Sequence, residues 1–136
     1  MNERMRFVVA IVIGLLVWIV VATLCNFALR ASIADYRAEE VAVAFTLIAQ
    51  LGRLALGVVS TAAAAAATAA LSRRSIVAPV VLGCVLLALF VPVHVSLWPR
   101  FPVWYHLFFL ASLPLVAYMV GKLMAQRRGA VRFGRA

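Results

Sequence analysis

The sequence predicts an all-α polytopic membrane protein, a single domain built as a bundle of four transmembrane helices. Two observations lead to this class. Of the 136 residues, 67% are hydrophobic and only 12% are charged, with a mean hydropathy of +1.10, whereas a soluble domain is about half apolar and a quarter charged. The apolar residues also form four long stretches, each at least as long as the ~20 residues that a helix needs to cross a bilayer.

Three of the four stretches predict spanning helices directly. The first covers residues 7–27 and contains no charged residue. The third covers residues 76–97 and the fourth residues 103–123, and both are bounded by charged residues or by proline and aromatic clusters. The remaining residues, 124–136, form a basic tail.

The second stretch, residues 41–71, is too long for one perpendicular crossing. At 1.5 Å per residue it would extend about 46 Å, against a hydrocarbon core of about 30 Å. The polar turn at residues 72–75 fixes its C-terminal end, so we predict a span over residues 52–71. Residues 38–51 then form a helical extension on the membrane surface, with Arg53 at the boundary. The alternative is a tilted helix that carries Arg53 deeper into the membrane.

The distribution of basic residues predicts the orientation. Cytoplasmic loops are enriched in Lys and Arg, so we expect both termini in the cytoplasm. The basic residues that give the chain its net charge of +9 lie beside the spans. This arrangement favours contact with anionic membrane lipids over contact with nucleic acid. With an inner N-terminus, nine of the 13 basic residues lie on the inner side: Arg4, Arg6, Arg73, Arg74, Lys122, Arg127, Arg128, Arg132 and Arg135.

The second span is rich in small residues. Small side chains let helix backbones approach closely, and this packing drives association in lipid. We therefore expect protein to surround this helix, either the other three spans or a second copy of the chain. A homo-oligomer or a larger membrane complex would follow from the second case. The residues that we expect to carry the packing are Gly57, Thr61, Ala65 and Ala69.

Polar residues gather at one depth, the outer ends of all four predicted spans. Polar groups inside a membrane usually face protein or a cavity. We therefore predict a shallow, basic, outward-facing pocket for an anionic ligand, a lipid head group or a loop of a partner. Its candidate residues are Asn26, Arg30, Gln50, Arg53, His94, Tyr105 and His106.

A simpler interpretation assigns each of these residues a local structural role. Asn26 would cap the first helix, and Arg53 would extend to head-group phosphates. His94 and His106 would bond carbonyl groups freed by prolines. This interpretation and the ligand pocket both remain open at the level of sequence.

The ionisable residues argue against several activities. The four acidic residues end at Glu40, so no acid lies within a span to couple proton movement, and no catalytic triad can be assembled. We expect no enzyme activity, no cofactor and no metal. The two histidines His94 and His106 suggest a haem- or quinone-binding redox module, which we rank last because no nearby carboxylate would orient either ring.

Several short patterns are similar to a group of small bacterial four-helix membrane proteins of uncharacterised function. The resemblance rests on Arg53-Leu-Ala-Leu-Gly57 before an alanine-rich helix, then Val91-Pro-Val-His94, and then Phe101-Pro-Val-Trp-Tyr-His106-Leu. It covers nearly the whole chain and implies four spans in a bacterial inner membrane. It implies no chemistry.

These observations lead to a ranked set of functions. We expect a small integral membrane protein that acts as a non-enzymatic subunit or as a homo-oligomeric bundle. The alternative is a transporter or channel for a small solute or anion, with entry through the basic outer rim that contains Arg53.

Overall fold

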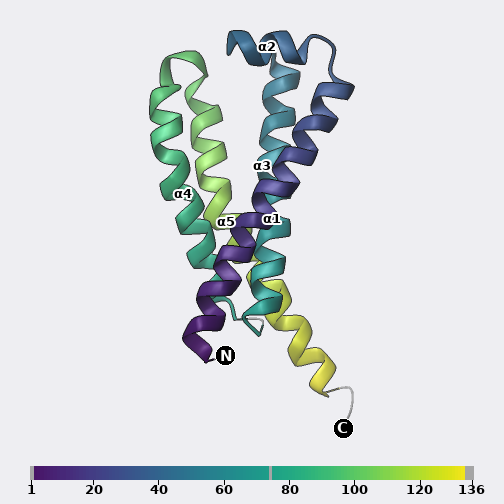
Figure 1. Ribbon diagram of the computed structural model, residues 1–136, viewed down its shortest axis with the longest axis vertical. Coiled ribbons are helices and arrows are strands. Elements are labelled where there is room, and N and C mark those ends of the chain that lie inside the picture. Colours follow the sequence, from purple (N-terminus) through teal and green to yellow (C-terminus); the bar gives the residue numbers. More distant parts are fainter. Residues whose placement is uncertain (1, 74, 134–136) are drawn as a thin grey trace.

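The computed structural model describes residues 2–73 and 75–133, the last six of them (128–133) by their backbone alone. The regular structure in this part of the chain is entirely helical (Figure 1). Arg74 and Arg135, two of the residues that we expect on the inner side, lie outside the described residues. The elements are α1 (Glu3–Ser32), α2 (Tyr36–Ala42), α3 (Leu47–Leu71), α4 (Val77–Ser96), the 3-10 turn η1 (Trp98–Arg100) and α5 (Val103–Phe133).

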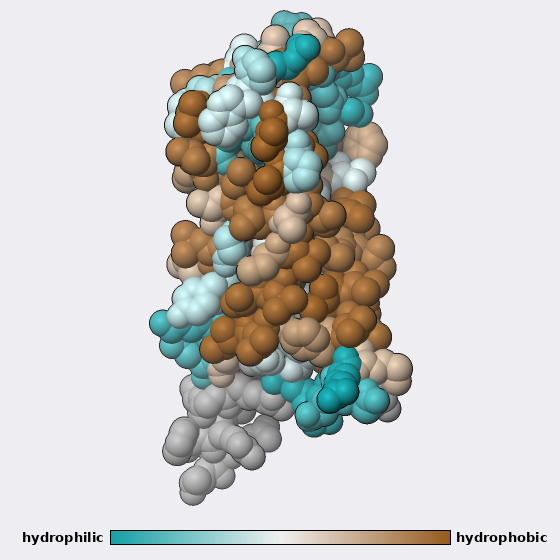
Figure 2. All heavy atoms as spheres, turned by 90° about the vertical axis from the view of Figure 1, so that its left-hand side faces the viewer, coloured by the Kyte–Doolittle hydropathy of each residue, from teal (hydrophilic) through white to brown (hydrophobic). Residues whose placement is uncertain are grey.

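Four of these helices, α1, α3, α4 and α5, are long and apolar enough to cross a membrane. The four predicted spans are therefore confirmed as apolar helices, although α1 and α5 extend well beyond their predicted bounds. Both ends of the chain lie at one end of the bundle, and α2 and η1 lie at the other (Figure 1). A broad apolar band separates more hydrophilic side chains at the two ends (Figure 2).

The predicted helical extension over residues 38–51 is wrong, because two separate helices share this segment. Helix α2 ends where Val43 adopts a left-handed conformation (φ 51°), and the chain then turns. Thr46 starts α3 as its N-cap, with its hydroxyl accepting from the Ala49 amide at 3.4 Å. The Glu39 carboxylate accepts from the Thr46 amide at 3.0 Å and holds the turn. As a result α2 lies across the end of the bundle (Figure 1).

One face of α3, formed by small residues, is covered by the other spans of the same chain. Gly57, Thr61, Ala65 and Ala69 are all buried. The Thr61 hydroxyl accepts from the indole N–H of Trp18 on α1 at 3.1 Å. Since α1, α4 and α5 all pack against α3, the other spans of the same chain bury these four residues.

Helices α4 and α5 form the second closely packed pair. A Cβ on Gly83 would lie 2.9 Å from the Cα of Pro114 and 3.1 Å from the carbonyl oxygen of Leu113. Further along the pair, a Cβ on Gly121 would lie 3.2 Å from the Cβ of Pro79. Because glycine has no side chain, the two helices approach each other closely at these positions. Such close packing drives the association of helices in lipid.

Candidate functional site

A polar cluster surrounds Glu40, where α2 lies against the end of α1. The Arg30 guanidinium forms two hydrogen bonds to Oε2 of Glu40, at 2.6 Å from Nη2 and 2.9 Å from Nε. The amide of Asn26 donates to Oε1 at 3.2 Å. The Tyr36 hydroxyl in turn donates to Oδ1 of Asn26 at 3.1 Å. Both oxygens of Glu40 are thus satisfied, and α2 is bonded to α1.

The pKa of Glu40 is lower than the usual value of 4.5. Burial of the carboxyl acts in the opposite direction and raises the pKa. The hydrogen bonds from Asn26 and Arg30, together with the charges of Arg30 and Arg53, outweigh burial. Glu40 is therefore ionised at neutral pH.

Arg53 lies behind this cluster, on the second turn of α3, and is half-buried. Its Nη1 donates to the Tyr36 hydroxyl at 3.2 Å, and its Cζ lies 4.7 Å from the centre of the Phe45 ring. Its Nε is buried and has no hydrogen-bond partner among the described residues. Glu40 forms its ion pair with Arg30, and Arg53 acts on the same carboxylate only through the longer-range attraction of its charge.

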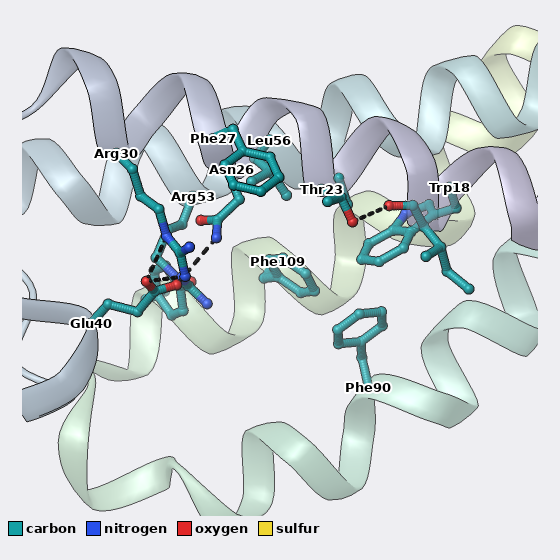
Figure 3. Close-up of a pocket in the computed structure, with 13 residues that line it drawn as sticks. Trp18, Thr23, Asn26, Phe27, Arg30, Glu40, Arg53, Leu56, Phe90 and Phe109 are labelled. Carbon is teal, nitrogen blue, oxygen red and sulfur yellow. Dashed lines mark hydrogen bonds and ion pairs between the residues drawn. The ribbon is translucent and has the colours of Figure 1, made fainter. Parts of the chain in front are cut away.

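A cavity of about 420 Å³ opens beside Arg53, between α1 and the α4–α5 pair (Figure 3). Its lining along α1 extends from Arg30 to Trp18, which is about 18 Å at 1.5 Å per residue. The charged and amide groups lie together at one end, and Phe90, Phe109 and Trp18 lie toward the other (Figure 3). The full lining is Trp18, Ile19, Ala22, Thr23, Asn26, Phe27, Arg30, Glu40, Arg53, Leu56, Phe90, Tyr105 and Phe109.

Four of the seven predicted site residues line this cavity: Asn26, Arg30, Arg53 and Tyr105. Gln50 is not among the lining residues, and its side-chain amide donates to the Phe45 carbonyl at 3.0 Å. The cavity also reaches more than three helical turns along α1, so the description of a shallow pocket is corrected.

Two residues that sequence reasoning missed complete the cluster. Tyr36 and Glu40 lie four residues apart on α2, a spacing that places both on one face of a helix. That spacing, in a chain with only four acidic residues, was the available signal. It went unused because residues 38–51 were interpreted as one helix along the membrane surface.

The two remaining predicted residues, His94 and His106, are not among the lining residues of the cavity and pair with each other. Their Nδ1 atoms lie 2.8 Å apart in the buried end of the α4–α5 pair. Trp98 stacks on the His106 ring at 4.7 Å, and Tyr105 stacks on His94 at 5.9 Å. One ring donates its Nδ1 proton to the other, so the pair is a hydrogen bond that joins the two helices across η1.

This geometry does not fit a metal or haem iron shared by the two Nδ1 atoms. Two nitrogens on one tetrahedral zinc, each about 2.0–2.1 Å from the metal, lie about 3.3 Å apart, and nitrogens on opposite sides of a haem iron lie further apart still. At 2.8 Å the two imidazoles bond each other.

A double-mutant cycle is expected to show that the histidine pair acts as a unit. Each single change, His94→Phe or His106→Phe, leaves one buried imidazole without its partner and is expected to lower the free energy of unfolding by about 1–3 kcal/mol. The double variant removes both polar groups and is expected to cost less than the sum. Denaturation in mixed micelles, followed by circular dichroism, measures all four proteins, and additive losses would show that the rings are not coupled.

Comparisons with protein-family models, curated proteins and solved structures found no match to this chain.

Proposed function

We propose that the chain is a non-enzymatic, multi-pass protein of the bacterial inner membrane, with both termini in the cytoplasm, that binds an anionic ligand at its outer end. In this proposal it acts as a binding subunit, alone or within a larger membrane assembly. The four apolar helices support the membrane location. The excess of basic residues on the side of the termini supports the orientation.

The environment of Arg53 is the main observation that supports an anionic ligand. A buried cation is costly unless a charged or hydrogen-bonding partner compensates it. Glu40 is already bonded by Arg30 and Asn26, so one carboxylate serves two guanidinium groups. The direct contacts of Arg53 are the Tyr36 hydroxyl and the Phe45 ring. An anionic group in the adjoining cavity would supply the missing counter-charge.

Binding is better supported than passage of a solute through one chain. On the side of the termini, below the level of Trp18, α1 and α3 pack so closely that a Cβ on Gly14 would collide with the Thr68 hydroxyl. The same hydroxyl donates to the Ala10 carbonyl at 3.2 Å and links the two helices. The same Cβ would lie 3.0 Å from Cδ2 of Leu82 on α4, so three helices pack together below the cavity.

The subunit or homo-oligomer part of the proposal rests on α1. This helix is the least buried of the four candidate spans, with 11% of its most apolar window buried. Its exposed face includes Val12, Leu16 and Val20. Such a face suits lipid or the helix of another chain, and the mass of the gently extracted particle distinguishes the two.

The test compares two arginines at the same end of the molecule. We expect native mass spectrometry of protein extracted gently from its membrane to show wild type carrying an anionic molecule. Arg53→Gln is expected to lose this molecule. Arg37→Gln is the matched control, because Arg37 is exposed on α2 and does not line the cavity. Equal retention by the two variants would contradict anion binding at Arg53.

A further inference from the structure

The shape and charge of the cavity indicate more than an anion. We propose that it binds a single-chain amphiphile with a carboxylate head, such as a long-chain fatty acid, with the head at Arg53 and the chain extending toward Trp18. This inference rests on the proposed function, since it names the ligand of the same site.

The charged end of the cavity matches a head group with one negative charge. Arg30 and Arg53 contribute two positive charges and Glu40 one negative charge, so the cluster carries a net charge of +1. A carboxylate balances this charge, whereas a phosphate monoester would leave it negative. Arg53 lines this end of the cavity, and a guanidinium suits a carboxylate because its donors match both oxygens.

The other end of the cavity suits an alkyl chain. Beyond the charged cluster the lining is mainly apolar, from all four long helices: Trp18, Ile19, Ala22, Leu56, Phe90 and Phe109. The volume of about 420 Å³ falls near the lower end of the ~300–1,000 Å³ typical of pockets for one small ligand. It therefore accommodates one chain better than the two chains of a phospholipid.

The cavity also has access from the side that would face lipid. Ile19 and Phe27 line it, and both are more than half exposed on the flank of α1. An amphiphile already in the outer leaflet has its head at the level of α2 and its chain along the helices, so it can enter sideways without leaving the membrane.

Brominated palmitate tests where the chain lies, because bromine quenches the fluorescence of a nearby tryptophan. The protein carries Trp98→Phe and Trp104→Phe, so that Trp18 alone reports, and it is placed in nanodiscs of zwitterionic lipid. We expect bromine near the chain end to quench Trp18 strongly and bromine next to the carboxylate to quench it weakly. Equal quenching by the two probes would overturn the proposed direction of the chain.

Matched ligands and variants separate the two parts of the proposal. Because hydrogen bonds to charged groups are the strong ones, we expect palmityl alcohol to bind about tenfold or more weakly than palmitate, and Arg53→Gln to reduce palmitate binding similarly. Ala22→Phe fills the apolar part of the cavity and is expected to abolish palmitate binding. Ala28→Phe is the control, since Ala28 is exposed on α1 outside the lining.

Results that contradict the proposal distinguish a failure of anion recognition from a failure of the alkyl-chain site. If the alcohol binds as well as the acid and Arg53→Gln has no effect, anion recognition fails and the proposed function fails with it. If hexanoate binds as tightly as palmitate, or Ala22→Phe binds palmitate normally, the chain site fails while anion binding stands. Preferential binding of a two-chain anionic phospholipid would also overturn the single-chain ligand.

Discussion

Replacing Gly83 with alanine is expected to destabilise the bundle by about 1–3 kcal/mol, the usual cost of overpacking a well-packed site. The new methyl group would lie 2.9 Å from the Cα of Pro114 and from the Cβ of Ala117, and 3.1 Å from the Leu113 carbonyl oxygen. Two of these three neighbours are backbone atoms, which cannot rotate away, so the two helices must separate. The loss is expected although alanine is the better helix former by about 1 kcal/mol.

Gly52→Ala is the matched control for this experiment. A Cβ on Gly52 meets Leu29 Cδ2 at 2.8 Å, and this atom is the far end of a flexible side chain that can adopt another rotamer. The variant is expected to be neutral or slightly stabilising. Reversible denaturation of both variants in mixed micelles, followed by circular dichroism, gives the two free energies. Equal losses at the two positions would mean that close backbone approach between α4 and α5 does not set the stability.

The sequence predicted the four long helices because their signal is physical and local. A run of about 20 apolar residues has few alternatives to crossing a bilayer as a helix, so each of the stretches 7–27, 76–97 and 103–123 coincides with an observed helix to within a residue at its ends or lies inside it. The small residues of α3 were informative for a similar reason. Short side chains gain little from contact with lipid, and the four residues expected to carry the packing, Gly57, Thr61, Ala65 and Ala69, are buried.

The break between α2 and α3 was not predictable in the same way. Val43 adopts a left-handed conformation that is uncommon for a β-branched residue, so the residue at the turn itself gave no signal of it. Thr46, an effective N-cap, was the one available indication. Without the break, α2 could not cross the end of the bundle, and Glu40 could not reach Arg30.

The candidate site was predicted only in part. The depth of a residue along a span can be read from the sequence, whereas the rotation of each helix about its own axis cannot. Counting residues placed Asn26, Arg30, Arg53 and Tyr105 at one level, and they do line one cavity. The same count placed Gln50 at that level as well, yet its side chain turns to the Phe45 carbonyl. Which polar groups share a cavity depends on the rotation and tilt of each helix, which are set by packing between helices.

Replacing Glu40 with glutamine is expected to release α2 from the bundle. The change removes the carboxylate that bonds Arg30 and Asn26 and leaves Arg30 and Arg53 without a negative charge between them. Hydrogen bonds to charged groups contribute about 1.5–3 kcal/mol each, and partial exposure of both partners reduces this figure. We expect the amides of residues 36–42 to exchange about tenfold or more faster in Glu40→Gln than in wild type.

The same carboxylate makes the attachment of α2 sensitive to acid. The pKa of Glu40 is lower in the folded protein than its ordinary value of 4.5. The bonds of its carboxylate therefore contribute their full stability above pH 4.5, and this stability is lost as the pH falls through the pKa of the folded protein. Hydrogen exchange of the amides of residues 36–42 in wild type, corrected for the intrinsic effect of pH, should therefore accelerate below pH 4.5. Its rate should approach the rate in Glu40→Gln. Asp35→Asn is the control, because Asp35 is exposed and makes no capping bond. An acid response that persists unchanged in Glu40→Gln would assign it to another group, because the glutamine side chain of that variant does not titrate.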